Sequence, residues 1–458
     1  MAHSPLYHVV FCMVSIMVLK EVNNIITEPY MDEPFHVPQA QAYCNGEWTT
    51  WDPKITTPPG LYVLSVIIKR LITFRCNLPV LRLTPLLTLL ALPFALTRLL
   101  CYHKRLRPPV SFFTPTAESV VLSAFPVAWF FGFLYYTDVP SVLFVVTSII
   151  AATESRHWTA ALLGLISCTF RQTNVVWLFY GYISSQLTFL RFRRDGARLP
   201  DPPALTASPG DLIRIASSAP KIVLGVLPSF VPYFVDATLF ALFVKWNGGI
   251  VLGDKANHIP AFHVPQIYYF IAFSTIMGWP ALISGKEGLG PLIHGLSPVH
   301  PLYHDTHPTP RRSTVTLVLV LLMAFTVHRY TIHHPFLLSD NRHYTFYVWR
   351  RIFMLHPVVP YLLIPGYLAC GWAWFLRIGA DQTLLQALLL PVCVLPVLLP
   401  TPLLEPRYFL VPYLLLRAQV VDVSGWGLVL EGVWYTLINA VTMWVFLYRE
   451  RGGIRFMW

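Results

Sequence analysis

The carboxylates that could do chemistry gather in one polar segment near the start of the chain, residues 28–60. Long apolar runs flank this segment, so it must lie outside a bilayer core, where charged side chains are too costly. Asp32 and Glu33 follow almost directly on the first apolar run, at the depth of a lipid headgroup. Such a carboxylate can take the proton of an acceptor hydroxyl while a bond forms to its oxygen. The position suits an enzyme acting on lipid-linked substrates, and a solvated acidic pair is the plainer alternative.

One base is enough for a sugar transferred from a lipid phosphate. The phosphate leaves as an anion, so its departure needs no acid catalyst. Asp138, in a polar turn before a later apolar run, is a further carboxylate on the same predicted face. Capping of the helix that follows would explain Asp138 equally well.

A second set of residues is basic and lies in polar turns on the side opposite the basic loops. Its members are Arg171, Lys255, Arg342 and Arg407. Guanidinium groups bind phosphate through two parallel hydrogen bonds, so the set suits a phosphate or diphosphate headgroup. Arg342 is the best candidate because residues 339–344 are polar and lie away from a span end. Arg171 also fits a structural cap, and Arg350 and Arg351 equally fit interfacial anchors.

The composition defines the elements that must position these residues. Of 458 residues, 55% are hydrophobic and only 12% charged, which is typical of a polytopic membrane protein. Spans of about 20 residues cross a bilayer as helices, because helices satisfy their own backbone groups. The net charge of +11 is scattered at the ends of apolar runs, so it indicates topology and not a nucleic-acid partner. The 40 prolines predict kinked spans.

We predict one membrane domain over residues 1–458, with about twelve spanning helices and both termini cytoplasmic. The predicted spans are residues 6–26, 80–100, 119–136, 139–154, 157–170, 174–190, 222–246, 263–283, 314–331, 358–378, 384–400 and 428–448. The segments predicted to be cytoplasmic are residues 103–107, the loops 191–221 and 284–312, and the tail 449–455. Residues 61–74 are short and are split by Lys69 and Arg70, which favours an interfacial amphipathic helix over a tilted complete span.

Cysteine and histidine spacing predicts neither a disulfide framework nor a metal site. The seven cysteines are unclustered, and Cys44 fits an ordinary loop thiol. His36, His258, His263 and His343 match no standard metal-ligand spacing, so hydrogen-bonding roles are favoured. No cofactor is evident from the sequence, and a requirement for a divalent cation stays open.

Several motifs together resemble one known family. They are YMDEPFH at residues 30–36, PQAQ at 38–41, WDPKITTPPGLY at 51–62, FRQTN at 170–174, GDK at 253–255, SDNRHYTFYVW at 339–349 and EPRYF at 405–409. In this order they are similar to the dolichyl-phosphate-glucose α-1,2-glucosyltransferases of asparagine-linked glycosylation. The resemblance covers nearly the whole chain except the cytoplasmic loops. Pro34 departs from it, since an aliphatic residue is typical there.

The resemblance implies an all-α polytopic enzyme of the C-type glycosyltransferase fold in the endoplasmic reticulum membrane, with a lumenal catalytic loop at residues 28–60. The implied donor is β-linked dolichyl phosphate glucose, and the implied acceptor is the diglucosylated dolichyl-diphosphate oligosaccharide. An α-1,2 product then requires inversion, which a single displacement with one base provides. Membrane lipid is the other implied partner, and the oligomeric state stays open.

The resemblance also suggests residue roles. Asp32 would take the proton from the acceptor 2-hydroxyl, with Glu33 as its neighbour or substitute, and Arg342 would hold the donor phosphate. The positions matching the family's substrate-binding motifs are His36, Gln39, Trp51, Asp52, Asp340, Asn341, His343 and Tyr344. Aromatic rings such as Trp51 and Tyr344 can stack on sugars, although membrane-interface anchoring is their commoner use.

Three other functions are compatible with the sequence. A transporter or flippase for lipid-linked sugar also needs arginines and aromatic rings, but it predicts charged or broken helices at mid-membrane. A mannosyltransferase using dolichyl phosphate mannose differs only in the sugar, and only the motifs favour glucose. A catalytically silent membrane partner would not need the carboxylates and Arg342.

Overall fold

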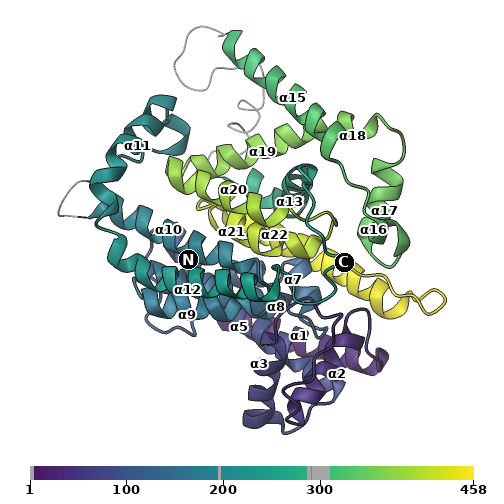
Figure 1. The fold of residues 1–458 in the computed structure, drawn as a ribbon. Helices are drawn as coiled ribbons and strands as arrows, with labels where there is room; N and C mark the ends of the chain where they lie inside the picture. Colours follow the sequence, from purple (N-terminus) through teal and green to yellow (C-terminus); the bar gives the residue numbers. More distant parts are fainter. Residues whose placement is uncertain (1–4, 194–197, 286–289, 291–309) are drawn as a thin grey trace. The chain divides into compact units, whose positions relative to one another are not determined.

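The computed structural model describes residues 5–193, 198–285, 290 and 310–458, and these ranges are helical (Figure 1). No strand occurs within them, where the sheet-like contacts are three isolated bridges. Contacts divide the chain into two compact units, each described by itself. Unit 1 is Met1–Pro200, Pro209–Ile259 and Ile438–Met443; unit 2 is Asp201–Ser208, Pro260–Leu437 and Trp444–Trp458.

Every predicted span falls on one helix or on a consecutive pair. The unit 1 helices are α1 Pro5–Ile25, α2 Glu33–Cys44, α3 Gly60–Ile68, the π-helix η1 Lys69–Thr73, α4 Leu78–Leu81, α5 Leu83–His103, α6 Ala117–Ser123, α7 Pro126–Phe131, α8 Asp138–Thr153, α9 His157–Cys168, α10 Asn174–Phe192, α11 Pro209–Val223 and α12 Leu227–Asn247. The others are η2 Ala204–Thr206, α13 Pro265–Ile283, α15 Pro310–Tyr330, α16 Pro335–Ser339, α17 Tyr344–Val348, the π-helix η3 Trp349–Phe353, α18 Val359–Leu362, α19 Ile364–Gly379, α20 Leu384–Leu398, η4 Pro406–Phe409, α21 Leu410–Ala418 and α22 Gly425–Tyr448.

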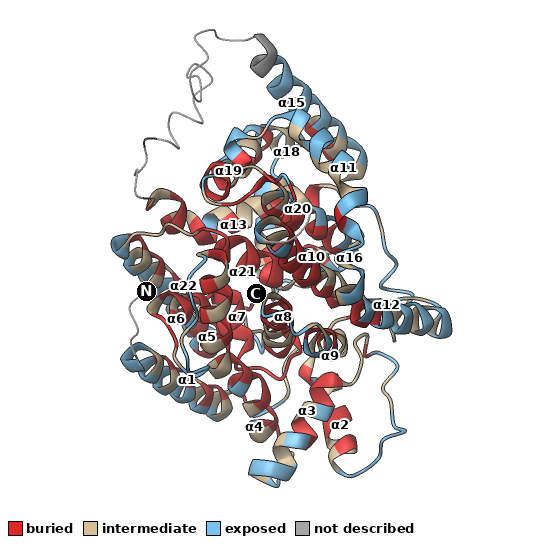
Figure 2. Cartoon of the chain, turned by 90° about the vertical axis from the view of Figure 1, so that its left-hand side faces the viewer, coloured by how far each residue is buried: buried red, intermediate tan, exposed pale blue. Residues whose placement is uncertain are grey.

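Six of the described helical stretches are long and apolar enough to cross a membrane. They are Pro5–Ile25, Leu78–His103, Leu227–Asn247, Pro265–Ile283, Val359–Gly379 and Gly425–Tyr448. Their outward faces are apolar: Leu6, Met13 and Met17 are exposed on α1, in a helix drawn partly pale blue in Figure 2. Exposed apolar faces of this kind fit contact with lipid. The structure therefore agrees with the predicted all-α polytopic membrane protein.

One predicted span, residues 119–136, is broken into α6 and α7. Pro126 opens α7, and proline cannot continue a helix because it lacks an N–H and its ring clashes with the preceding turn. The chain beyond α7 leaves helical geometry before α8 begins at Asp138. Tyr135 and Tyr136 lie in this irregular, buried segment, where their polar groups are available to the site.

The polar opening segment folds around α2 and α3. Pro34, the departure from the family pattern, lies in the first turn of α2, where a missing N–H costs nothing. The segment's buried apolar side chains, including Val37 and Tyr43, form one core cluster with later residues such as Tyr135 and Phe170.

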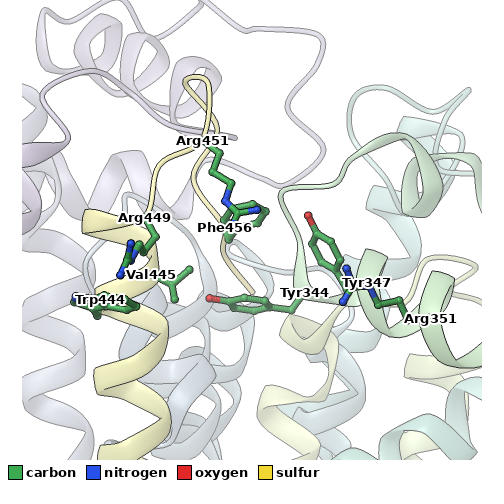
Figure 3. Close-up of a pocket in the computed structure, with 8 residues that line it drawn as sticks. All are labelled: Tyr344, Tyr347, Arg351, Trp444, Val445, Arg449, Arg451 and Phe456. Carbon is green, nitrogen blue, oxygen red and sulfur yellow. The ribbon is translucent and has the colours of Figure 1, made fainter.

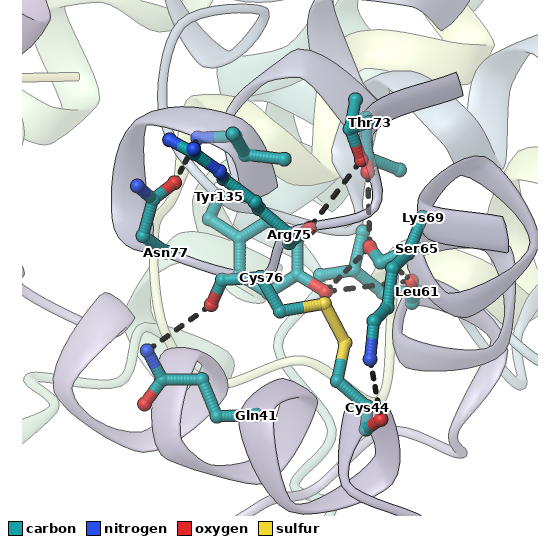
Figure 4. The surroundings of a disulfide bond; sticks show 12 residues. Gln41, Cys44, Leu61, Ser65, Lys69, Thr73, Arg75, Cys76, Asn77 and Tyr135 are labelled. Atoms are coloured by element: carbon teal, nitrogen blue, oxygen red, sulfur yellow. Dashed lines mark hydrogen bonds between the residues drawn. A yellow bond between two sulfur atoms is a disulfide. The ribbon is translucent and has the colours of Figure 1, made fainter.

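The prediction that Cys44 is an ordinary loop thiol is wrong. Cys44, at the end of α2, forms a disulfide with Cys76, just before α4 (Figure 4). The carbonyl of Cys76 accepts a hydrogen bond from Gln41 Nε2 at 3.2 Å, and that of Cys44 accepts one from Lys69 Nζ at 2.7 Å. The two cysteines are 32 residues apart in sequence, and spacing alone does not reveal such a pair.

Residues 61–74 form α3 followed by the π-helix η1. Leu71, Ile72 and Phe74 are exposed at its end, and Lys69 turns inward to the Cys44 carbonyl. The helix is thus present where an interfacial helix was predicted, with apolar side chains on its outer surface.

One of the two long segments predicted to be cytoplasmic loops is partly helical. Residues 191–221, predicted to be a loop, contain most of α11, so that prediction is wrong for the helical part. Within unit 2, the Asp201 carboxylate accepts a hydrogen bond from the Leu385 N–H at 3.0 Å, in the first turn of α20. Most of the loop 284–312 lies outside the described residues.

In unit 2, the chain after α20 passes once along α13 through residues that no predicted span covers. Before α13, the His263 N–H donates to the Leu399 carbonyl at 2.8 Å, and after α13, the Ser424 N–H donates to the Ser284 carbonyl at 3.0 Å. The chain between Leu399 and Ser424 therefore runs from one end of this 19-residue helix to the other. It contains η4 and α21, and every residue of Leu410–Ala418 is buried.

A charged residue and two prolines interrupt the apolar run around α21, so the hydrophobic pattern did not predict a spanning helix there. Arg417 lies in α21, but its guanidinium makes two hydrogen bonds to Glu431 of α22, at 2.8 and 2.7 Å, and both side chains are fully buried. Pro406 and Pro412 further shorten the apolar run. A paired charge is tolerated inside a membrane protein when its partner comes from a neighbouring helix.

The structure is incompatible with the predicted placement of Arg342 and the C-terminal tail on opposite sides of the membrane. The Met457 N–H donates to the Arg342 carbonyl at 2.9 Å, and the Tyr344 N–H donates to the Met457 carbonyl at 3.1 Å. Segments on opposite sides of a membrane cannot share backbone hydrogen bonds, so the tail lies on the same side as Arg342. A crossing through α21 would account for the difference, because it would change the parity of the spans between Arg342 and the tail.

Candidate active site

The acidic pair lies in a tight turn at the start of α2. Met31, just before it, has a φ of 61°, a left-handed conformation that non-glycine residues seldom adopt. The Glu33 N–H closes the turn on the Tyr30 carbonyl at 3.1 Å. Strained residues of this kind persist where the surroundings hold them and are frequent at functional sites.

Glu33 is fully buried and forms an ion pair with Arg82. Arg82 donates from Nε to Oε1 at 2.9 Å and from Nη2 to Oε2 at 2.6 Å, and both side chains are 0% exposed. The N–H of Tyr135 adds a bond to Oε1 at 2.8 Å, and that of Tyr30 adds one to Oε2 at 3.0 Å. Arg82 also donates to the Ile26 carbonyl at 2.8 Å. Glu33 therefore joins the ends of several helices around the turn.

Sequence reasoning missed Arg82. It opens α5 at the edge of a predicted span, where a basic residue fits a topology signal. The one available signal was that it lies within an otherwise apolar run, since a lone charge there needs a partner.

Asp32 differs from Glu33 in its surroundings. Asp32 is only partly buried, and its backbone N–H donates to the Tyr136 hydroxyl at 3.0 Å. Although Asp32 occupies the N-cap position of α2, its carboxylate makes no capping hydrogen bond. The Asp32 side chain therefore does not cap the start of α2.

Asp138 lies two residues after Tyr136 and is paired with Arg171. Arg171 Nη2 donates to Asp138 Oδ1 at 2.6 Å, and the Asp138 side chain is 1% exposed. Its Oδ2 is buried with no hydrogen-bond partner among the described residues. Tyr136 thus brings Asp32 and Asp138 to one region of unit 1, and a buried, half-satisfied carboxylate is typical of functional sites.

The motifs around Arg171 and Lys255 hold the opening loop, residues 28–60, by hydrogen bonds to its backbone carbonyls. Gln172 Nε2 and the Leu252 N–H both donate to the Thr56 carbonyl, at 2.8 and 3.1 Å. The Asp254 N–H donates to the Pro53 carbonyl at 2.9 Å. A Cβ added at Gly253 would lie 2.3 Å from that same carbonyl oxygen, so the approach requires glycine.

Lys255 itself points back to its own segment, where Nζ donates to the Asn247 carbonyl. The lysine is exposed in unit 1.

The motif residues of the opening loop hold one another. Gln39 donates to the Thr50 carbonyl at 2.7 Å and accepts from the Asp52 N–H at 2.9 Å. His36 Nδ1 lies 2.6 Å from the Tyr62 hydroxyl, and the Trp51 ring packs edge-on against Tyr62 with centroids 6.2 Å apart. These residues build a defined loop surface in which Trp51 and Asp52 stay partly exposed.

In unit 2, Arg342 is held by Asp340. Its Nε and Nη2 donate to the two carboxylate oxygens at 2.8 and 2.7 Å. Burial raises the pKa of Asp340, but hydrogen bonds from Arg342 outweigh this effect and leave the pKa below its ordinary value. His343 Nδ1 contacts the Trp458 carbonyl at 2.6 Å, while Asn341 is exposed.

Arg407 is paired in the same manner. Its Nε and Nη2 lie 3.1 and 2.9 Å from Glu405 Oε2. Thus Arg171, Arg342 and Arg407, all predicted to face a phosphate, each have a carboxylate at hydrogen-bond distance. No group of His, Cys, Asp and Glu residues in the described ranges has the arrangement of a metal site.

Comparison with known proteins identifies the family. A sequence model described as the DIE2/ALG10 family matches residues 26–418. The chain belongs to this family.

Three relatives of this DIE2/ALG10 family member are each named "Dol-P-Glc:Glc(2)Man(9)GlcNAc(2)-PP-Dol alpha-1,2-glucosyltransferase". The protein from Arabidopsis thaliana is 33% identical, covering 95% of this chain and 96% of its own length. Those from Homo sapiens and Mus musculus are 32% and 34% identical, each covering 97% of this chain and 96% of its own length. No solved structure matches this chain. The family assignment confirms the resemblance found in the motifs.

Proposed function

We propose that this chain transfers glucose from dolichyl phosphate glucose to the diglucosylated dolichyl-diphosphate oligosaccharide, in α-1,2 linkage. The observation that carries the proposal is full-length similarity: the three relatives described above, which bear this activity in their names, cover at least 95% of the chain. All seven motifs lie within or overlap the matched residues 26–418. The same comparisons favour glucose over mannose and an enzyme over a transporter.

Asp32 is the base in this proposal. It takes the proton of the acceptor 2-hydroxyl as that oxygen bonds to the glucose anomeric carbon, and the bond from that carbon to the phosphate oxygen breaks. Dolichyl phosphate leaves as the anion with the bonding electron pair. A carboxylate placed within reach contributes typically 10²–10⁴-fold to such a step.

The geometry favours Asp32 over Glu33 as the base. Each oxygen of Glu33 already accepts two hydrogen bonds, one from Arg82 and one from a backbone N–H. Protonating Glu33 would break the buried ion pair, which is costly. Asp138, with one unpartnered oxygen, is the alternative base or a second contact for the acceptor.

The remaining predicted residues are proposed as substrate contacts. Arg342 keeps 40% of its side chain exposed despite its bond to Asp340, so a donor phosphate can reach it. Arg171, Lys255 and Arg407 are weaker candidates for the same role. The acceptor and donor sugars would contact the motif residues His36, Gln39, Trp51, Asp52, Asp340, Asn341, His343 and Tyr344.

We further propose a C-type glycosyltransferase fold in the endoplasmic reticulum membrane, with the site facing the lumen. The Cys44–Cys76 disulfide supports this orientation, because disulfides form in oxidising compartments such as that lumen. It also supports an interfacial helix at residues 61–74, because two cysteines on opposite sides of a membrane could not bond. The span count is then about twelve from the apolar runs plus the crossing through α21.

The test is glucose transfer by purified protein from dolichyl phosphate glucose to the diglucosylated lipid-linked acceptor. Wild type should form the triglucosylated product, and Asp32→Asn should lose about 10²–10⁴-fold in rate while remaining folded. Glu47→Gln makes the same carboxylate-to-amide change at an exposed position of the same loop and should keep full activity.

Two outcomes would redirect the proposal. Full activity in Asp32→Asn, with loss in Asp138→Asn, would move the base to Asp138. Absence of transfer by well-folded wild type, tested with both glucose and mannose donors, would favour the transporter.

A further inference from the structure

A cavity of about 450 Å³ lies in unit 2 between the Arg342 motif and the C-terminal tail (Figure 3). Tyr344, Tyr347 and Arg351 border it from α17 and η3, and Trp444 and Arg449 border it from the end of α22. All of its lining residues belong to unit 2. The tail residues lie beyond the part of the chain that the family model matches, which ends at residue 418.

The tail is held against the motif by its backbone. The parallel bridge between His343 and Met457 fixes the register. Two residues before Met457, Arg455 reaches back to the end of α22 and donates to the Phe446 and Leu447 carbonyls at 3.1 and 2.7 Å, which satisfies open carbonyl groups there. The cavity walls are therefore anchored on both sides.

Three arginines line this cavity without an acidic partner. Arg351, Arg449 and Arg451 form no ion pair and no side-chain hydrogen bond within the described residues. Glu450, the nearest acidic residue in sequence, is bonded to Arg455 instead. These guanidinium groups differ in this respect from Arg171, Arg342 and Arg407, whose charges are balanced by carboxylates.

Aromatic rings position two of the three guanidinium groups. Arg449 lies over the Trp444 ring at 4.4 Å from its centroid, and Arg351 lies over the Tyr347 ring at 5.6 Å. Figure 3 shows Arg449 and Arg351 on separate sides of the cavity, with the Tyr344 ring between them. Cation–π contacts orient a guanidinium but do not neutralise it, so positive charge faces a cavity that is otherwise aromatic and apolar.

We propose that this cavity binds the phosphate of a polyprenyl phosphate, so that Arg351 and the tail arginines extend the donor phosphate site assigned above to Arg342. The inference rests on the proposed function, since donor and leaving product both carry a phosphate on a prenyl chain. Arginine suits phosphate because its donors form a planar fork, and the surrounding rings suit the sugar or the first prenyl unit. An anionic phospholipid headgroup has the same phosphate chemistry, so the experiment must separate the two sources.

The test measures binding of farnesyl phosphate to purified full-length protein in phosphatidylcholine nanodiscs. Arg351→Gln and Arg449→Gln should each weaken binding by about tenfold, since a hydrogen bond to a charged group contributes on that scale. Arg449→Lys should recover part of the loss. The matched control is Arg350→Gln, the exposed neighbour of Arg351 in η3 that does not line the cavity, and its affinity should not change.

Each alternative result would overturn the inference. Unchanged affinity in a folded Arg351→Gln, Arg449→Gln double variant would exclude this cavity as the phosphate site. Equal competition by phosphatidic acid would assign it to phospholipid headgroups, and equal binding of farnesol would show that the phosphate is not recognised.

Transfer kinetics separate failure of this inference from failure of the proposed function. If wild type transfers glucose and the double variant keeps the wild-type KM for dolichyl phosphate glucose, only the inference fails. If wild type transfers no glucose, the proposed function fails whatever the binding result. The expected result is a raised KM for the donor, with the KM for the acceptor little changed.

Discussion

Asp32 and Glu33 are adjacent carboxylates with opposite roles in the structure. Glu33 is enclosed by Arg82 and two backbone N–H groups, whereas Asp32 is partly exposed beside Tyr136. The enclosed residue holds the turn in which the other lies. Loss of either should therefore reduce activity, but by different physical routes.

Stability measurements should distinguish these routes. Removing one partner of a buried ion pair leaves an uncompensated charge and costs about 3–5 kcal/mol. We expect Arg82→Met to lower the unfolding temperature strongly, as judged by thermal unfolding of the purified protein in detergent. Asp32→Asn should unfold near the wild-type temperature while losing transfer. A stable Arg82→Met protein would contradict the structural role assigned to the pair.

The sequence located the acidic pair and its motifs but did not separate the two carboxylates. Both residues are acidic, adjacent and equally close to the first span, and only Arg82, 49 positions after Glu33, decides between them. The arginines of the tail were likewise interpreted as a positive-inside signal. That rule counts basic residues and takes no account of which carboxylate faces a given arginine.

At the scale of elements, the close approach at Gly253 joins the segment after α12 to the opening loop. Gly253→Ala would place a methyl group 2.3 Å from the Pro53 carbonyl oxygen, so the loop must move. We expect a folded protein with clearly reduced kcat/KM for transfer. Gly249→Ala is the matched control, because nothing lies within 4 Å of its added Cβ. Equal activity of the two variants would show that the approach is not needed.

The Cys44–Cys76 disulfide should contribute to stability chiefly by restricting the unfolded chain. For a separation of 32 residues, loop-closure entropy gives about 3–4 kcal/mol. Cys44→Ser and Cys76→Ser should therefore lower the unfolding temperature by similar amounts, and the double variant should be no worse than either. Cys370→Ser, at a free cysteine, is the control. Additive losses in the double variant would argue against the bond, which mass spectrometry without reduction can check directly.

Apolar runs predicted the positions of the helices well, because a spanning helix needs little beyond length and hydrophobicity. Apolar runs did not predict a buried helix whose charged residue is neutralised by a partner distant in sequence. Helix α21 contains Arg417, which is acceptable only because Glu431 of α22 neutralises it. The fold of residues 28–60 depends on the disulfide and on backbone contacts from distant motifs, and neither has a local signal.

For the whole molecule, the pairing of Met457 with Arg342 and Tyr344 makes a topological prediction. A glycosylation acceptor sequence appended after Trp458 on a short linker should be modified in microsomes together with one inserted near Ser339. Both attached glycans should be protected from a glycosidase added outside the microsomes until the membrane is permeabilised. Modification near Ser339 alone would show that the tail is cytoplasmic and that no crossing through α21 exists.

The disulfide also makes the opening loop a closed covalent ring that contains Trp51 and Asp52. A protease that cuts once within this ring leaves both new ends attached to the same molecule. Nicked protein should therefore migrate as a single full-length chain until a reducing agent separates the fragments. The segment proposed to meet the acceptor sugar would thus stay tethered after damage that would release an open loop.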